Sequence, residues 1–138
     1  MNLTGNWQGF YEYGSGYDLP HFGQRVNIKA SIIDINGSFT GEIKEDSSVF
    51  STKLEATIKG FVEADFISFV KKYSKRPIIV EHSATIKYEE GSLEIEHEGF
   101  VDVQNNSIYG NWLIIETITD EFGTFENSTQ GIWLLTKI

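Results

Sequence analysis

The sequence predicts an all-β fold, in which an antiparallel up-and-down meander of eight to ten strands closes into a β-barrel. Apolar and polar residues alternate with a period of two along most of the chain, and short turn signals separate the alternating runs. An open sheet of this size would leave two unpaired edges and an apolar face that no helix in the sequence covers. Closure into a barrel removes both problems.

Four stretches show the alternation most clearly, and each is expected to form a strand with one buried face. They are residues 26–32, 53–59, 93–96 and 108–114. Turn-forming pairs suited to tight hairpins separate the runs, at Asn36-Gly37, Glu90-Gly91 and Asn105-Asn106. The inward positions predict a core made of Trp7, Val26, Ile28, Phe39, Ile58, Phe69, Ile86, Ile95, Trp112 and Trp133.

Residues 63–73 fit two structures. Phe66, Phe69 and Tyr73 lie at helical spacing, and Asp65 precedes them as a possible helix cap. The segment is, however, rich in aromatic and β-branched residues and follows a glycine-containing strand, which favours β-structure. We therefore expect a strand here.

Length and composition exclude several classes of protein. The 138 residues indicate a single domain spanning residues 1–138. A net charge of −9 argues against binding to nucleic acid or anionic lipid, because both need clustered Lys and Arg. The absence of cysteine excludes disulfides, thiol catalysis and cysteine-ligated zinc. No apolar run approaches the roughly 20 residues of a membrane helix, and residues 1–4 lack signal-peptide features, so we expect a cytoplasmic protein.

Each of the three tryptophans follows a glycine by two positions, in Gly5-Asn6-Trp7, Gly110-Asn111-Trp112 and Gly131-Ile132-Trp133. A glycine at this spacing leaves room for the indole to lie over the backbone. A meander barrel that opens with Gly-x-Trp resembles the calycin superfamily of lipocalin-like and avidin-like proteins. Residues 3–7, 37–41 and 135–138 are most similar to the avidin pattern, whereas residues 67–73, Gly99 and residues 108–112 are similar to small bacterial lipocalin-like domains.

The resemblance implies a barrel that holds a small apolar ligand in its interior, but it does not imply biotin binding. At two positions where avidins carry a biotin-contacting Asn and Tyr, this chain has Gly9 and Ile43. Lipocalins cover the first tryptophan with an arginine near the last strand, and Lys137 is the residue available for that closure here.

Pairing the strands about the second and third turn signals brings polar side chains together on the inward face. The second turn sets His82 opposite Gly99, and the third sets His97 opposite Ile114. His82, His97 and Glu116 then lie on a diagonal across three strands, about 7 Å apart at each step.

These residues and the aromatic side chains near them form the candidate ligand site, which consists of His82, His97, Glu116, Trp112, Tyr11 and Tyr88. Gly99 is expected to leave a gap between His82 and Trp112. Polar groups on the floor of an apolar pocket can orient a small ligand, bind a metal or serve as acid and base. A satisfied buried polar network, or histidines at the barrel mouth in contact with water, explains the same pattern. We assign no catalytic residue, metal or cofactor.

A basic cluster, Lys71, Lys72, Lys75 and Arg76, holds four of the 11 positive charges. Such a run either steers an anionic ligand to a barrel opening or forms a solvated strand end, and the solvated surface is the more frequent case. The acidic segment 34–45 mimics a calcium loop, but Phe39 stands where that loop requires glycine. No phosphate-binding loop, nucleophile elbow or Ser/His/Asp spacing is present.

Three classes of function remain. The first is a non-catalytic barrel that binds a small, largely apolar ligand of unknown identity. The second is a protein-interaction or structural module with a filled core, and the third is an isomerase or hydrolase that uses the inward His and Glu. An interior cavity would separate the first class from the second, because a core packed to normal density leaves no room for a ligand.

Apolar residues at outward positions predict a homodimer that forms through the barrel wall. They are Leu113, Ile115, Ile132 and Leu134, from two strands expected to be neighbours. Monomers seldom leave a merged apolar patch uncovered. The alternative is that a loop or the N-terminal segment covers them.

Overall fold

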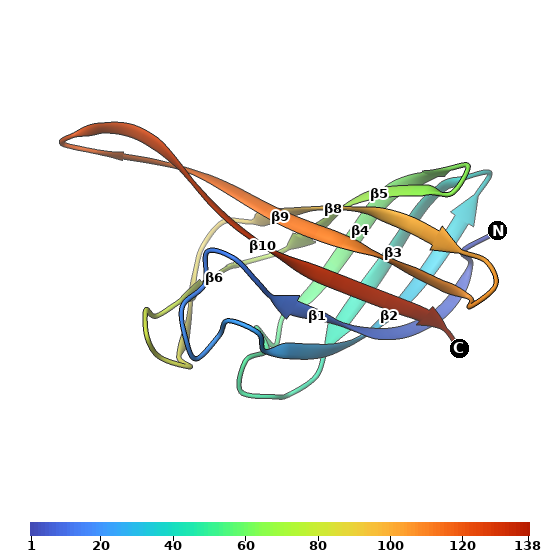
Figure 1. Ribbon diagram of the computed structural model, residues 1–138, viewed down its shortest axis with the longest axis horizontal. Helices are drawn as coiled ribbons and strands as arrows, with labels where there is room; N and C mark the ends of the chain where they lie inside the picture. The colour runs from blue at the N-terminus through green and yellow to red at the C-terminus, as the bar shows by residue number, and fades with distance from the viewer.

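The computed structural model describes all 138 residues and contains ten β-strands (Figure 1). Eight of them close into an antiparallel barrel in the spatial order β1-β10-β9-β8-β5-β4-β3-β2. The strands are β1 (Gly5–Tyr13), β2 (Arg25–Ile35), β3 (Ser38–Glu45), β4 (Glu55–Glu63), β5 (Phe66–Tyr73), β6 (Arg76–Ile79), β7 (Ile86–Glu89), β8 (Leu93–Asp102), β9 (Ser107–Asp120) and β10 (Gly123–Lys137). The predicted up-and-down β-barrel is confirmed. No helix is present that is long and apolar enough to span a membrane.

The first turn is the predicted tight hairpin. Ile35 pairs with Ser38, and the two residues between them have positive φ, 53° for Asn36 and 89° for Gly37. Two positive φ values are what a two-residue hairpin turn that matches strand twist requires, and Asn-Gly supplies them at low cost. Residues 66–73 form strand β5, so the expectation of a strand rather than a helix is also confirmed.

Strands β6 and β7 lie outside the barrel, which the sequence pattern did not predict. They pair with each other in a separate two-stranded sheet, and β8 pairs with β5 instead of β7. The expected hairpin at Glu90-Gly91 is therefore wrong. The physical reason is that residues 80–85 form a local loop closed by the Val80 N–H, which donates to the Thr85 carbonyl at 3.0 Å. The chain therefore closes a hairpin before it returns to the barrel.

The β8–β9 hairpin exists, but its register differs from the expectation by two residues. Its loop spans residues 103–106, with Asp102 paired to Ser107. The Asp102 carboxylate accepts hydrogen bonds from the backbone and side chain of Asn105, at 3.3 and 2.7 Å, which stabilises this longer loop. His97 consequently lies opposite Trp112 rather than Ile114. A shift of two keeps every side chain on its expected face.

The predicted core is buried, with one exception. Nine of the ten expected residues are buried, and Ile86 is only half-buried because β7 lies outside the barrel. The tryptophan–glycine packing also differs from the expectation. The Trp112 ring covers Gly131, its partner on the neighbouring strand, where a Cβ would stand 2.5 Å from ring atoms. Gly99 pairs with Gly110 and with Ile67, and it allows β8 and β9 to approach closely. His82 is not opposite Gly99, so the expected gap between His82 and Trp112 does not exist.

Both chain termini lie at the same end of the barrel (Figure 1), and buried side chains plug that end. Trp7 is fully buried there, and its indole N–H donates to the Leu3 carbonyl at 2.9 Å. The backbone N–H of Leu3 donates to the buried Asp34 carboxylate at 2.9 Å. The ammonium of Lys137 lies 5.9 Å from the centre of the Trp7 ring. Access to the interior is therefore through the opposite end.

At that opposite end, β9 and β10 continue past the barrel as a two-stranded arm, which Figure 1 shows in orange and red. The arm ends in a turn whose Phe122 is 90% exposed. Near its base the arm supplies side chains to the barrel opening.

Candidate functional site

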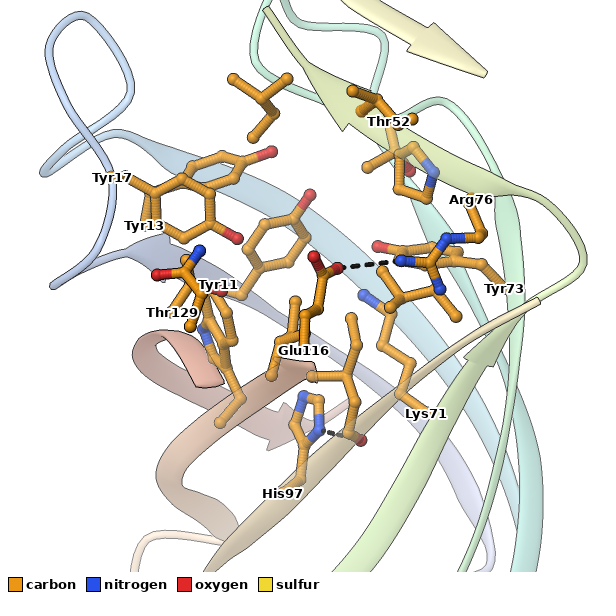
Figure 2. A pocket seen from close by; sticks show the side chains of 18 of the residues that line it. Tyr11, Tyr13, Tyr17, Thr52, Lys71, Tyr73, Arg76, His97, Glu116 and Thr129 are labelled. Atoms are coloured by element: carbon orange, nitrogen blue, oxygen red, sulfur yellow. Dashed lines mark hydrogen bonds and ion pairs between the residues drawn. The ribbon is translucent and has the colours of Figure 1, made fainter. Parts of the chain in front are cut away.

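A cavity of about 310 Å³ lies inside the barrel at the end opposite the termini (Figure 2). It is lined by apolar and aromatic side chains of several strands, by the β6 segment and by the base of the β9–β10 arm. Its lining residues are Tyr11, Tyr13, Tyr17, Thr52, Lys71, Tyr73, Arg76, Pro77, Ile78, Ile79, Glu89, Leu93, Ile95, His97, Trp112, Ile114, Glu116, Asn127 and Thr129. Its volume is at the lower end of the range of small-molecule pockets.

One wall of the cavity is aromatic. The ring of Tyr11 meets Tyr13 and Trp112 edge-on, with centroids 5.5 and 6.4 Å apart, and Tyr17 lies 5.9 Å from Trp112. Edge-to-face contacts of this kind hold rings in fixed orientations. Burial raises the pKa of Tyr17 to about 12, so this hydroxyl stays protonated at neutral pH. The wall is therefore rigid, apolar and uncharged.

Behind this wall lies a fully buried carboxylate, Glu45 at the end of β3. Its Oε1 accepts hydrogen bonds from the Tyr11 hydroxyl at 2.8 Å, the Thr52 N–H at 2.9 Å and the Ser51 hydroxyl at 3.0 Å. Its Oε2 accepts from the Tyr73 hydroxyl. Burial alone would raise the pKa of Glu45, but the Lys71 ammonium and these donors more than offset it and leave the pKa below its usual value. Glu45 is thus an ionised carboxylate inside the barrel.

Lys71 on β5 is the cationic partner of Glu45. Its side chain is only 3% exposed, and its Nζ lies 3.5 Å from Glu45 Oε2. The same Nζ lies 4.5 Å from the ring centre of Tyr11 and 4.7 Å from that of Tyr73. Burial lowers the pKa of Lys71, and the Glu45 carboxylate opposes this shift in part. Lys71 is therefore a buried amine at the surface of an apolar cavity.

His97 on β8 lies against the same space. Its ring stacks on Phe69 with centroids 4.5 Å apart, and its Nδ1 lies 3.1 Å from the Ile95 carbonyl oxygen. A carbonyl only accepts, so Nδ1 carries the proton and Nε2 carries the lone pair of the neutral ring. Burial lowers the pKa of His97 to about 3, and the Lys71 charge adds to the effect. His97 is therefore neutral at physiological pH.

An ion pair and the β6–β7 hairpin, called the strap below, span the mouth of the cavity. Arg76 from β6 and Glu116 from β9 form a bond of 3.0 Å, marked by a dashed line in Figure 2. Both side chains are partly exposed, so the pair contributes little stability. The β6–β7 hairpin is held by the Tyr88 hydroxyl, which donates to the Thr52 carbonyl. The entrance therefore consists of one hairpin joined to the barrel by a few polar contacts.

Both cations that line the cavity are paired, and Glu89 adds one further carboxylate to the lining. Each lining cation has its own carboxylate partner, Glu45 for Lys71 and Glu116 for Arg76. An anionic ligand would find no unpaired positive charge. The arrangement is suited to a neutral, mostly apolar molecule.

The structure brings four of the six predicted site residues to one cavity, namely Tyr11, His97, Trp112 and Glu116. The predicted diagonal is wrong, since Figure 2 shows the Glu116 carboxylate directed to Arg76 and away from the His97 ring. His82 lies in the β6–β7 turn with its side chain 70% exposed, 3.6 Å from Glu81 and 3.9 Å from Asp18.

Tyr88 is also outside the cavity lining, because it lies on β7 and its hydroxyl donates to the Thr52 carbonyl. Both misplacements follow from the error at the second turn signal, because β7 pairs with β6 and leaves the barrel wall to β5 and β8.

Sequence reasoning missed the Glu45–Lys71 pair. The sequence analysis places Lys71 in a basic cluster at a barrel opening or, more often, at a solvated strand end. Only Lys72 and Lys75 of that cluster are exposed, and Arg76 forms the mouth ion pair. The signal was available, since Lys71 shares its strand face with Phe69 and Tyr73, and Glu45 shares its face with Phe39 and Ile43. Alternation alone therefore indicates the inward direction of both side chains, but the sequence analysis did not draw that conclusion.

No protein-family model, curated protein or solved structure matches this chain. The geometry of the cavity therefore carries the functional argument.

Proposed function

We propose that the protein is a non-catalytic binding barrel for a small, neutral and largely apolar molecule, held in the interior cavity. The observation that carries this proposal is the cavity itself, about 310 Å³ in volume and lined mainly by tyrosine, tryptophan and aliphatic side chains. A barrel filled to normal packing density has no such space.

The two alternative functions have less support. A structural module with a filled core does not need a cavity that opens beneath a loosely attached strap. An isomerase or hydrolase built on His82, His97 and Glu116 loses its basis, because the three side chains do not meet.

We further propose that the chain is calycin-like, as its tryptophan motifs suggest. Two features of the plugged end support this: Trp7 fills the barrel base, and Lys137 lies over its ring where lipocalins use an arginine. The eight-stranded meander is the architecture that this resemblance implies.

The proposed function is tested by isothermal titration calorimetry with 2-naphthalenemethanol, a neutral probe with a rigid aromatic body. We expect saturable binding with one molecule per chain. The test variant is Ile114→Phe, which adds volume to a residue lining the cavity. The matched control is Ile33→Phe, at an exposed position of the outer wall.

Binding that is lost in Ile114→Phe and kept in Ile33→Phe would support the interior site. No binding by the wild-type protein, or equal binding by both variants, would contradict it. Native mass spectrometry of the purified protein gives an independent check, since a co-purified ligand would appear as added mass.

A further inference from the structure

We propose that Lys71 is a covalent attachment site, whose Nζ forms a reversible imine with an apolar aldehyde held in the cavity while Glu45 acts as proton carrier and counter-ion. This inference rests on the proposed function, because the cavity must first admit a ligand. It adds to that function a substrate class and a reacting atom.

The position of Lys71 supports this role. Its neighbour Lys72 points outward from the same strand, whereas Lys71 points inward and lines the cavity. Figure 2 shows its side chain extending toward the middle of the lining residues. An amine at this place meets any molecule that fills the cavity.

The contacts of the amine leave it free to react. Its one carboxylate contact, to Glu45, is 3.5 Å long, well beyond the roughly 2.7–2.9 Å of a strong charge-assisted hydrogen bond. Its other neighbours are the faces of Tyr11 and Tyr73. A lysine desolvated in an apolar pocket is a recognised form of activated nucleophile, because burial disfavours the ammonium relative to the neutral amine. Burial acts in this direction on the pKa of Lys71.

The reaction balances with groups that are present. Glu45 accepts one proton from the Lys71 ammonium, and the free amine attacks the aldehyde carbon to form a carbon–nitrogen bond. One proton then moves from the nitrogen to the carbinolamine oxygen, and Glu45 returns its proton to the same oxygen. That oxygen leaves as water, the nitrogen becomes a protonated imine and Glu45 is again a carboxylate. Ammonium plus aldehyde thus gives iminium plus water, with no oxidant or reductant. The positive charge stays at the same nitrogen, opposite the same carboxylate.

The lining defines the aldehyde. The other lining cation, Arg76, is paired with Glu116, so a carboxylate on the ligand would have no free partner. The Tyr11, Tyr13 and Trp112 rings favour an aromatic or conjugated body. The volume of about 310 Å³ restricts the ligand to a small one. The expected class is a small aromatic or conjugated aldehyde without a charged group.

The test uses 2-naphthaldehyde with sodium cyanoborohydride, which reduces an imine to a stable secondary amine. Intact-mass measurement should show one added naphthylmethyl group per chain, and peptide mapping should place it on Lys71. Binding in the cavity raises the local aldehyde concentration, so Lys71 should carry about tenfold more label than Lys72. The matched control Lys72→Met should leave labelling unchanged.

Two variants separate the roles of the pair. Glu45→Gln keeps the side-chain shape and one acceptor oxygen, but it removes the proton acceptor and one of the two oxygens that accept from the surrounding hydroxyls. We expect slower labelling of Lys71. The double variant Glu45→Gln/Lys71→Met replaces the ion pair with a neutral pair, so it avoids an unpaired buried charge, and it should lose the specific label.

Failure of this inference is distinguishable from failure of the proposed function. If 2-naphthalenemethanol binds but the label spreads evenly over the surface lysines, the imine proposal is wrong and the binding barrel stands. If the alcohol does not bind and Lys71 is not labelled, both are wrong. A label at Lys71 that an excess of the alcohol does not suppress would also overturn the proposal, because the reaction would not pass through the cavity.

Discussion

Acidification should destabilise this protein through His97, and the size of the effect follows from its burial. The folded protein holds the pKa of His97 at about 3, against an ordinary value of 6.5. Between these two values the unfolded chain binds a proton that the folded protein does not, so stability falls as the pH decreases through this window. A pH of 5 is 1.5 units below the ordinary pKa of histidine, which holds in the unfolded chain. Each unit of difference corresponds to about 1.4 kcal/mol of free energy of unfolding. We expect a loss of about 2 kcal/mol between pH 7 and pH 5 from this side chain.

The measurement is urea unfolding followed by tryptophan fluorescence at both pH values, for the wild type and for His97→Gln. The variant lacks the titrating ring, so its loss of stability between pH 7 and pH 5 should be smaller by about 2 kcal/mol. Burial lowers the pKa of His21 as well. The His97 contribution is therefore the difference between the stability losses of the wild type and of His97→Gln. His82→Gln, at an exposed position, is the matched control. If His97→Gln keeps the full wild-type loss, the reasoning about its burial is refuted.

Three further predictions concern stability and assembly. Trp112→Ala should destabilise the protein by about 3–5 kcal/mol in urea unfolding, because it opens a cavity next to the existing one; a loss under 1 kcal/mol would contradict its place in the core. Lys71→Met should lower the free energy of unfolding by about 3–5 kcal/mol, because it leaves Glu45 buried and unpaired. The double variant with Glu45→Gln should recover most of that loss. If the effects of the two changes simply add, the pairing of Glu45 with Lys71 is contradicted. Leu113→Glu should convert a dimer to a 15.6 kDa monomer in sedimentation at micromolar concentration, whereas a wild-type protein that is already monomeric would remove the dimer proposal.

The dimer prediction depends on the outer wall, where two of the four predicted residues are well exposed. Ile115 is 55% exposed and Ile132 is 40% exposed, while Leu113 and Leu134 are half-buried. No loop or terminal segment covers the two isoleucines. The patch lies on the adjacent strands β9 and β10, as the sequence predicted.

The barrel was predictable because its information is local. The period-two alternation indicates which residues face inward, and the pair Asn36-Gly37 indicates where the first hairpin turns. Alternation does not indicate which two strands are neighbours in the sheet. Residues 76–79 and 86–89 pair with each other outside the barrel, although nothing in their pattern distinguishes them from barrel strands. The two-residue register error at β8–β9 has a similar origin, since the loop length depends on how Asp102 holds Asn105.

The site was only partly predictable because its central contact is not a contact between neighbouring strands. Glu45 is on β3 and Lys71 is on β5, with β4 between them. Their side chains meet across the interior, so no hairpin register brings them together in a sequence argument. Lysine and glutamate are also rarely buried unless they are paired, and a single sequence does not reveal the partner. The inward direction of each was readable, but their meeting was not.

The Glu45–Lys71 pair is also the place where the sequence departs from what stability alone favours. Exchanging a buried ion pair for packed apolar residues is often neutral or stabilising, because desolvation offsets much of the charge attraction. The rest of the barrel follows the apolar-inward rule closely, and the opposite end is sealed by Trp7 and Leu3. Departures from consistent local rules concentrate at functional sites in natural proteins. Here the departure coincides with the cavity and with its only deeply buried amine, which is why the reactive chemistry is assigned to Lys71 and not to the exposed charges at the mouth.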